Sequence, residues 1–260
     1  VKSVAFHPSR NFLATCGRDK TLWIWEYSIT TNDEDGLPST SEVISPALFE
    51  KGLDSVLCSE QAFHFHIECV AVLEEHTGDV KTVVWSCVDE HELLSCSYDE
   101  NINVWKHSED TSNSEEWAVD ETLKGNKSTV WDLATTVYRN RKYLASVSAN
   151  AALILWENSS GHWKYIDTFT GLHTDEVLSC DFNANNFLLT ASRDNSVCVT
   201  DFTPVLEALK SEKPFQLRSQ KLLAHECDVN MVKWSPKDPG LFVSCGEDGF
   251  LKLWRVPLEG

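Results

Sequence analysis

Five segments of this chain repeat one spacing of polar and aromatic residues. In each segment a Ser or Thr is followed four positions later by Asp or Asn, and six positions after that by Trp or, once, Thr. The five sets are Thr15, Asp19, Trp25; Ser95, Asp99, Trp105; Ser146, Asn150, Trp156; Thr190, Asp194, Thr200; and Ser244, Asp248, Trp254. Self-similarity at a period of roughly 40–50 residues is typical of solenoids and propellers, so the repeat constrains the architecture before any local pattern is considered.

A histidine precedes three of these turn residues. His76, His173 and His225 each lie 21 to 23 positions before the turn aspartate, and Asn126 takes this place in the unit that carries Asn150. A hydrogen-bonded chain explains the set, because the Asp can accept from the His, the His can contact the hydroxyl, and the hydroxyl can accept from the Trp indole. The buried networks that we predict are His76, Ser95, Asp99, Trp105 and His225, Ser244, Asp248, Trp254.

Strands are visible around these anchors. Short β-rich runs such as Val80–Trp85, Leu93–Ser97, Ile102–Lys106 and Val119–Leu123 are separated by turn residues, at about four strands per unit. A four-stranded sheet cannot bury both faces alone, so such sheets pack as blades around a central channel. The sequence therefore predicts an all-β fold, a WD40 β-propeller.

The number of units bears on closure of the ring. We expect the units to span residues 1–75, 76–116, 117–162, 163–218 and 219–260. The first unit starts at Val1, inside its own innermost strand, with no preceding His. Because WD propellers most often close with seven blades, and an edge blade leaves a sheet edge unpaired, we expect the C-terminal five blades of a seven-bladed ring. A genuine five-bladed ring is the alternative.

Long insertions interrupt the units between their third and fourth strands. The longest covers residues 27–66, contains the acidic and Ser/Thr-rich stretch Thr30–Glu42, and shows no strand alternation. Shorter ones are Lys106–Glu116 and Thr203–Arg218. Connections of this length are usually functional or without fixed structure. The longest insertion is therefore either a solvated loop or a segment on which a partner docks.

Charge and hydropathy restrict the partners. Forty acidic residues against 22 basic ones give a net charge of −18 and a pI near 4.8. Such a field repels phosphate backbones, so we expect no direct binding of nucleic acid. No apolar run approaches the roughly 20 residues that cross a bilayer, so we expect no membrane insertion.

The nine cysteines favour packing over metal binding. Cys16, Cys96 and Cys245 all lie three positions before their turn aspartate, an equivalent strand position that suits a small buried side chain. An odd number of cysteines without paired spacing suits a reducing compartment. One group with liganding side chains, Cys58, His64, His66 and Cys69, matches no zinc module and is interpreted as loop and strand-entry residues. We predict neither a metal site nor a cofactor.

Catalysis is not indicated either. The chain has no Gly-rich phosphate loop, no GxSxG elbow and no HExxH motif. The Asp–His–Ser sets resemble a hydrolytic triad, but they recur in several units and are therefore interpreted as structural. We predict that the protein is not an enzyme.

A surface for partners is expected where the turns emerge. The exposed positions there are those just before the turn aspartate and those flanking the inner strand, and Arg, Tyr and Trp dominate binding energies at interfaces. The residues predicted to bind partners on this top face are Arg18, Tyr98, Trp131, Arg193, Lys81 and Glu247.

Several stretches resemble one family in particular. They are Leu13–Glu26 (LATCGRDKTLWIWE), Glu74–Trp85 (EEHTGDVKTVVW), Leu93–Lys106 (LLSCSYDENINVWK), Ser128–Ala134 (STVWDLA) and Ala224–Leu241 (AHECDVNMVKWSPKDPGL). Together they resemble the WD-repeat subunit of the cytosolic iron–sulfur protein assembly (CIA) targeting complex, over its third to seventh blades. The chain departs from that family at Gly17 and Asn126, which replace a Ser and a His, and in the length of the first insertion.

The resemblance implies a scaffold that helps deliver iron–sulfur clusters to cytosolic and nuclear apoproteins. It also implies four kinds of partner, namely a CIA cluster-transfer subunit, a HEAT-repeat adaptor, a hydrogenase-like iron–sulfur carrier and client apoproteins. Arg18 matches a top-face arginine that the family associates with function. The alternative is another WD40 adaptor, such as a ubiquitin-ligase substrate receptor or a signalling scaffold.

Overall fold

The computed structural model describes residues 1–31, 63–86, 91–109, 115–211 and 218–256. Its strands form five antiparallel sheets, which we call blades 1 to 5 in chain order. Blade 1 is β1 (Ser3–Phe6), β2 (Phe12–Cys16), β3 (Thr21–Thr31) and β4 (Phe63–Glu74). Blade 2 is β5 (Val80–Trp85), β6 (Glu92–Ser97), β7 (Ile102–Glu109) and β8 (Glu115–Leu123).

The remaining blades follow the same order. Blade 3 is β9 (Val130–Tyr138), β10 (Arg141–Ser148), β11 (Leu153–Ser159) and β12 (His162–Phe169). Blade 4 is β13 (Val177–Phe182), β14 (Phe187–Ser192), β15 (Ser196–Asp201) and β16 (Arg218–Leu223). Blade 5, in the described residues, is β17 (Val229–Trp234), β18 (Leu241–Gly246) and β19 (Leu251–Arg255). The all-β propeller architecture predicted from the sequence is confirmed.

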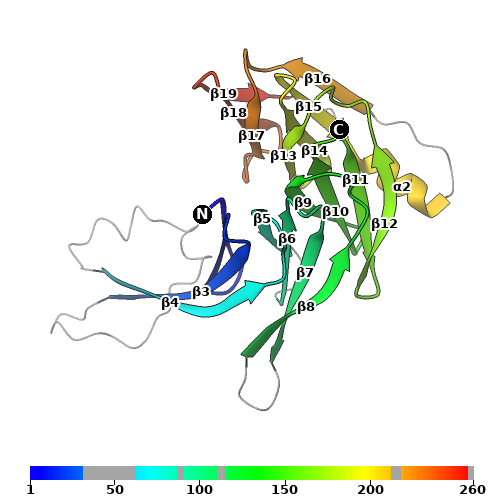
Figure 1. Ribbon diagram of the computed structural model, residues 1–260. Helices are drawn as coiled ribbons and strands as arrows, with labels where there is room; N and C mark the ends of the chain where they lie inside the picture. Colours follow the sequence, from blue (N-terminus) through cyan, green and yellow to red (C-terminus); the bar gives the residue numbers. More distant parts are fainter. Residues whose placement is uncertain (32–62, 87–90, 110–114, 212–217, 257–260) are drawn as a thin grey trace.

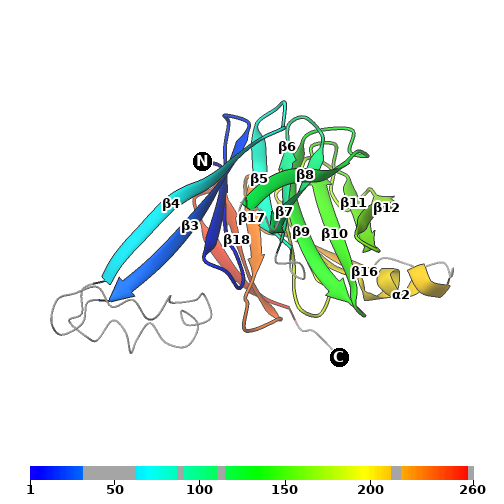
Figure 2. The ribbon, with the colours of Figure 1, turned by 90° about the horizontal axis from the view of Figure 1, so that it is seen from below.

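The blades lie side by side along an arc, with the long β3–β4 hairpin projecting from it (Figures 1 and 2). The first strand of each blade is innermost, and β1 packs beside β5, β5 beside β9, β9 beside β13, and β13 beside β17. A cavity of about 570 Å³ lies among these strands and is lined by residues from all five of them. This cavity is the central channel that radial packing of blades produces.

The hydrophobic core between the blades forms because side chains alternate between the two faces of each strand. In the interface between blades 2 and 3, Leu94 and Val104 pack with Leu133 and Leu144, each at most 2% exposed. Because side chains alternate between the two faces of a strand, every second residue of a middle strand reaches one neighbouring blade and the residues between reach the other. Burial of an aliphatic side chain contributes about 1.5–3 kcal/mol, which makes these interfaces the main source of stability.

The insertions differ from their sequence-based description. The prediction of no strand alternation in 27–66 was wrong at both ends, because β3 continues to Thr31 and pairs with β4 from Phe63 onward. Residues 32–62 lie outside the described residues. Likewise, β7 continues to Glu109 and β8 begins at Glu115. The third insertion contains a helix, α2 (Thr203–Ser211), which packs through Val205 and Leu206 into the core between blades 3 and 4.

The predicted unit 1–75 contains all four strands of blade 1, but the later unit boundaries fall before or within the outer strand of a blade. The strand β8 crosses the boundary between residues 116 and 117 yet pairs with β7 of the unit before it. Strands β12 and β16 cross or adjoin the next two boundaries in the same way and pair with β11 and β15. Each outer strand therefore completes one blade and leads directly into the His or Asn that begins the next network.

Candidate interaction surface

Blade 2 contains a continuous chain of hydrogen bonds between the four residues that the sequence brings together. His76 Nδ1 lies 2.8 Å from Asp99 Oδ2, and His76 Nε2 lies 2.8 Å from Ser95 Oγ. The indole N–H of Trp105 donates to the same hydroxyl at 2.8 Å. Asp99 also accepts from the backbone N–H of Thr77 at 2.8 Å. The network therefore ties the start of the blade to the turn between its second and third strands.

The environment of Asp99 favours its ionised form. Burial by itself raises the pKa of this carboxyl group. The hydrogen bond and charge of His76, together with the N–H of Thr77, outweigh burial and lower the pKa to about 2. The aspartate is thus a negatively charged anchor that holds the turn in place.

Blade 5 repeats this arrangement. His225 Nδ1 lies 2.8 Å from Asp248, His225 Nε2 lies 2.7 Å from Ser244 Oγ, and Trp254 Nε1 donates to that hydroxyl at 2.9 Å. The pKa of Asp248 is lowered, because hydrogen bonds from His225 and the backbone outweigh the effect of burial. Blades 2 and 5, although distant in the sequence, therefore stabilise the equivalent turn with the same set of hydrogen bonds.

Blades 3 and 4 modify the network without abolishing it. In blade 4, His173 lies between Asp194 and Thr190, and Lys221 binds Asp194 at 2.6 Å, while Thr200 occupies the Trp position. Burial lowers the pKa of His173 below its ordinary value, although Asp194 partly opposes this.

In blade 3, Ser146 donates to Asn126 at 3.3 Å and accepts from Trp156 at 3.0 Å. Asn150 does not extend this chain, because it accepts from Ser148 Oγ at 2.6 Å, and among the described residues the buried Asn126 Nδ2 has no hydrogen-bond partner. Neutral amides therefore replace the His–Asp pair at the same place in the blade.

Burial separates these sets from a catalytic triad. Ser95 and Ser244 are fully buried, and His76 and His225 are each 6% exposed. The hydroxyl of each serine is already occupied by an imidazole and an indole. A nucleophile must reach its substrate, so these four side chains hold the fold together.

The turns place the residue before each aspartate at one common face, which we call the turn face. The N–H of Tyr98 donates to the carbonyl of Asp79, and that of Arg193 to the carbonyl of Glu176. Glu247 does the same toward Asp228. The residue after the turn aspartate, or after Asn150 in blade 3, has a left-handed backbone in every blade; these residues are Lys20, Glu100, Ala151, Asn195 and Gly249. The turn face is therefore a regular feature of all five blades.

An aromatic pair with a cation between its rings lies on this face. The ammonium of Lys81 is 3.8 Å from the centre of the Tyr98 ring and 4.6 Å from that of Trp131. The two rings meet edge to face with their centres 5.5 Å apart. Tyr98 is 45% exposed. Cation–π contacts orient the lysine, so the structure brings three of the sequence-predicted residues into one cluster that solvent can reach.

The two arginines of the turn face differ in their environment. Arg193 bridges blades 4 and 5, because it donates to Glu176 at 2.9 Å and to Asp228 at 2.9 Å. Arg18 is exposed and forms no ion pair within the part of the chain that the structure describes. The two arginines therefore differ: two carboxylates hold Arg193, whereas the side chain of Arg18 is exposed to solvent. Glu247 is also exposed and lies in the turn between β18 and β19 of blade 5.

A further polar residue, which is not among the predicted site residues, lies near the central channel. Asp132 is 8% exposed and accepts from Ser179 Oγ at 2.9 Å and from the N–H of Cys180 at 3.0 Å. Burial raises the pKa of Asp132, although Lys233 opposes this. Asp132 therefore joins blades 3 and 4. An aspartate in an otherwise apolar inner strand is the sequence signal for such a role.

The predicted cysteine position is explained by packing. Cys16 and Cys96 are buried at equivalent points of β2 and β6, and burial raises the pKa of the Cys16 thiol to about 12. Cys245 is partly exposed. Cys58 lies outside the described residues, as does the side chain of His64. The residues that are described contain no group of three or more His, Cys, Asp or Glu placed to hold a metal ion.

Fold and turns together define a WD-repeat protein. A model of the WD domain, G-beta repeat family matches residues 1–26, 67–106, 163–201 and 217–255, more than half of the chain. The chain belongs to this family. Within the described residues, no helix is long and apolar enough to cross a membrane.

Among curated proteins, several relatives share one name. The chain is 29% identical, over 98% of its length, to the probable cytosolic iron-sulfur protein assembly protein 1 of Neurospora crassa. It is 28% identical, also over 98% of its length, to the protein of that name in Vanderwaltozyma polyspora, and covers 80% of that relative. An Aedes aegypti relative, probable cytosolic iron-sulfur protein assembly protein Ciao1, is 32% identical over 59% of the chain.

These relatives are longer than the chain. It spans 49% of the Neurospora crassa protein and 64% of the Chaetomium globosum protein of the same name. The resemblance noted in the sequence is confirmed by the similarity to these proteins. The alternative of an unrelated WD40 adaptor is not favoured by them.

Proposed function

We propose that this chain is a non-catalytic scaffold of the cytosolic iron–sulfur protein assembly machinery, which helps deliver clusters to cytosolic and nuclear apoproteins. The observation that carries the proposal is the similarity, along almost the whole chain, to proteins named for this assembly. The burial of every triad-like set supports a role without catalysis. The protein acts in the cytosol and also in the nucleus.

The turn face supplies the contact with partners. Arg18 offers an exposed guanidinium that has no ion pair among the described residues, and such a group binds carboxylates through two parallel hydrogen bonds. The cluster of Lys81, Tyr98 and Trp131 adds aromatic area and a second cation. Aromatic residues and arginine contribute most of the energy at interfaces. Partners with acidic and apolar side chains therefore fit this face.

The other two predicted residues, Arg193 and Glu247, contribute less to partner binding. Arg193 contributes indirectly, because its two ion pairs fix the spacing of blades 4 and 5. Glu247 lies at the margin of the turn face and contacts basic side chains of a partner. The proposed partners are the cluster-transfer subunit, the HEAT-repeat adaptor, the hydrogenase-like carrier and the client apoproteins.

Affinity purification tests the proposal. The protein is tagged and purified from its own cells, with an Arg18→Glu variant and an Arg139→Glu variant in parallel. Arg139 is an exposed arginine outside the turn face that pairs with Glu207, and it serves as the matched control. We expect a cluster-transfer subunit and a HEAT-repeat protein with the parent and the control, and client enzymes to be reduced with Arg18→Glu. Recovery of a cullin adaptor in place of these subunits would contradict the proposal.

A further inference from the structure

Two of the three residues in the cluster of Lys81, Tyr98 and Trp131, called the aromatic cluster below, lie at equivalent β-bulges. In both β5 and β9 the pairing with the next strand skips one residue, which is Lys81 in β5 and Trp131 in β9. A bulged residue has no partner in the ladder, and the bulge changes the direction of its side chain. The contacts of Lys81 and Trp131 with Tyr98 therefore depend on the two bulges.

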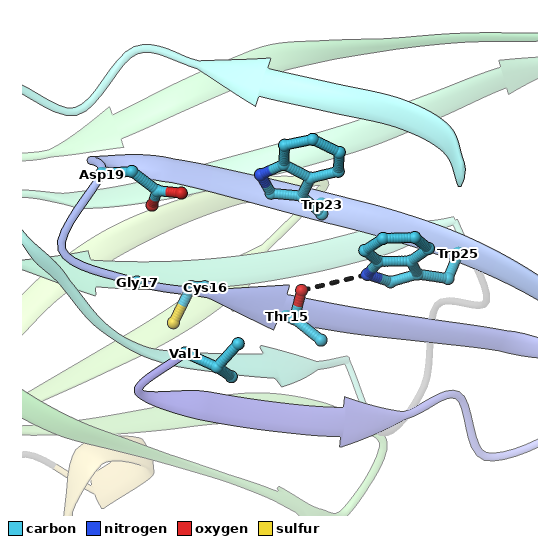
Figure 3. Close-up of a pocket in the computed structure, with 7 residues that line it drawn as sticks. All are labelled: Val1, Thr15, Cys16, Gly17, Asp19, Trp23 and Trp25. Carbon is cyan, nitrogen blue, oxygen red and sulfur yellow. Dashed lines mark hydrogen bonds between the residues drawn. The ribbon is translucent and has the colours of Figure 1, made fainter. Parts of the chain in front are cut away.

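The indole of Trp131 is not held by a hydrogen bond of its own. In the repeat networks the indole N–H donates to a hydroxyl, from Trp105 to Ser95 at 2.8 Å and from Trp25 to Thr15 at 3.0 Å (Figure 3). Among the described residues, by contrast, the buried Trp131 Nε1 has no hydrogen-bond partner. The direction of this ring therefore depends on its backbone and on its ring contacts.

Two side chains from the inner strands fix the backbone at this bulge. Thr82 of β5 donates from Oγ1 to the carbonyl of Trp131 at 3.1 Å. Asp132, the next residue, accepts through Oδ2 from Ser179 Oγ at 2.9 Å and from the N–H of Cys180 at 3.0 Å. The first contact ties the bulge to blade 2, and the second ties it to blade 4.

A carboxylate at this position is specific to blade 3 among the described bulges. The residues that follow the bulge in blades 2, 4 and 5 are Thr82, Ser179 and Met231. Asp132 is 8% exposed, and both of its oxygens accept hydrogen bonds. Buried charged groups are a weak source of stability and are better attested as devices that fix one arrangement. The arrangement next to Asp132 is the bulge that carries Trp131.

We propose that Asp132 and Thr82 are positioning residues for the aromatic cluster. They fix the bulge of β9 and thereby hold the Trp131 ring in contact with its two neighbours. A partner contacts the cluster, and Asp132 affects this contact only through Trp131. The effect on partners rests on the function proposed for the turn face, whereas the positioning of the ring does not.

The first test observes the Trp131 ring in the free chain. The ten tryptophans are replaced by 5-fluorotryptophan, and Trp131→Phe assigns the fluorine-19 resonance of this ring. Spectra are recorded well below the melting temperature of each variant, so that every chain is folded. We expect Asp132→Asn and Thr82→Val each to shift the Trp131 resonance by more than its width in the parent.

Asp181→Asn is the matched control for this spectrum. Asp181 joins the inner strands of blades 4 and 5, because it accepts from the N–H of Trp234 at 2.8 Å. This variant should shift the Trp234 resonance and leave that of Trp131 in place. An unchanged Trp131 resonance in Asp132→Asn or in Thr82→Val would overturn the positioning role of the substituted residue.

The second test asks whether Asp132 affects partner binding only through Trp131. The tagged parent chain, Trp131→Ala, Asp132→Asn and the double variant are used to capture the proposed assembly partners from cell extract. We expect Trp131→Ala to lower the recovery of these partners about tenfold, and Asp132→Asn to lower the recovery of the same partners. The double variant should recover as much as Trp131→Ala, because residues that act through one contact are not additive.

The outcomes of the second test separate the two proposals. Full recovery with Trp131→Ala would contradict the function proposed for the turn face, and the fluorine spectra would still decide the positioning of the ring. A further loss in the double variant, beyond that of Trp131→Ala, would overturn the claim that Asp132 acts through Trp131.

Discussion

The imidazole of His76 lies 2.8 Å from the carboxylate of Asp99, and the exposed fractions of the two side chains are 0% and 7%. This contact fixes the turn between β6 and β7 from inside the blade. The residue before the aspartate, Tyr98, is then held outward beside Lys81. Stability and recognition therefore depend on adjacent residues with opposite orientations, and substitutions can separate the two.

Removal of the Asp99 carboxylate should destabilise the fold. Asp99→Ala leaves His76 and the N–H of Thr77 without their acceptor, which costs about 1–3 kcal/mol of unfolding free energy. The matched control is Asp19→Ala, at the equivalent position of blade 1, where the carboxylate is exposed and we expect less than about 1 kcal/mol. Urea denaturation measures both variants. Equal losses would show that the His76 contact contributes nothing.

Low pH should remove the stability that the ionised carboxylate of Asp99 contributes to the fold. The pKa of Asp99 is about 2 in the folded state, below the ordinary value of 3.8. A lowered pKa gives stability that is fully present above about pH 4 and is lost as the pH falls toward 2, with a total of about 2 kcal/mol. We expect the difference in unfolding free energy between the parent and Asp99→Asn to shrink over this interval. A difference that stays constant from pH 5 to pH 2 would contradict the assignment.

Substitution of the buried Asp132 should lower the free energy of unfolding, even though this residue lies near the central channel. Asp132→Ala removes the acceptor of Ser179 Oγ and of the N–H of Cys180, so blades 3 and 4 lose a shared contact. We expect a loss of about 2–3 kcal/mol in thermal or urea unfolding. Asp132→Asn retains one acceptor oxygen and should lose less. The reverse order of the two variants would argue against the hydrogen-bonding role.

The sequence predicts the networks better than it predicts the surface. Each network joins residues at a fixed separation within one repeat, so spacing alone identifies His225, Ser244 and Asp248. The prediction that Arg193 binds partners was based on its residue type and its position before the turn aspartate. Its engagement depends on Asp228, which lies 35 positions away in the next blade, and repeat spacing says nothing of that contact.

Two local features of the insertions were also missed for physical reasons. Apolar and polar residues do alternate from Tyr27 to Thr30 and from Phe63 to Glu68, and these two runs pair as β3 and β4. Residues 32–62 separate the two runs in the sequence, so neither run by itself indicates its pairing partner. The helix α2 did have a sequence signal, since Pro204 occupies a first-turn position that suits helices. The all-β repeat simply outweighed that signal in the prediction.

Charge reversal at Arg18 should separate function from folding. Because Arg18 is exposed and has no internal ion pair in the described residues, Arg18→Glu should leave the melting temperature within about 1 °C of the parent. The matched variant Arg193→Glu breaks two ion pairs between blades and places three carboxylates together, so it should melt lower. Differential scanning calorimetry distinguishes them. A larger loss for Arg18→Glu would show that its side chain is structural.

Metal analysis tests the role of the cysteines. If these residues serve packing, the purified protein should contain no stoichiometric iron or zinc and should show no visible cluster absorbance. Elemental analysis after anaerobic purification measures this directly. Iron at one or more clusters per chain would contradict a role as scaffold alone.

The most direct measurement of the central claim is radioactive iron incorporation into client enzymes in cells. Cells that lack the native protein are supplied with the parent, with Arg18→Glu or with Arg139→Glu, and cytosolic and mitochondrial iron–sulfur enzymes are immunoprecipitated. We expect the parent and Arg139→Glu to restore iron in the cytosolic enzymes, and Arg18→Glu to leave it low despite normal abundance, with the mitochondrial enzymes unchanged throughout. Normal iron loading of the cytosolic enzymes in cells without the protein would contradict the account.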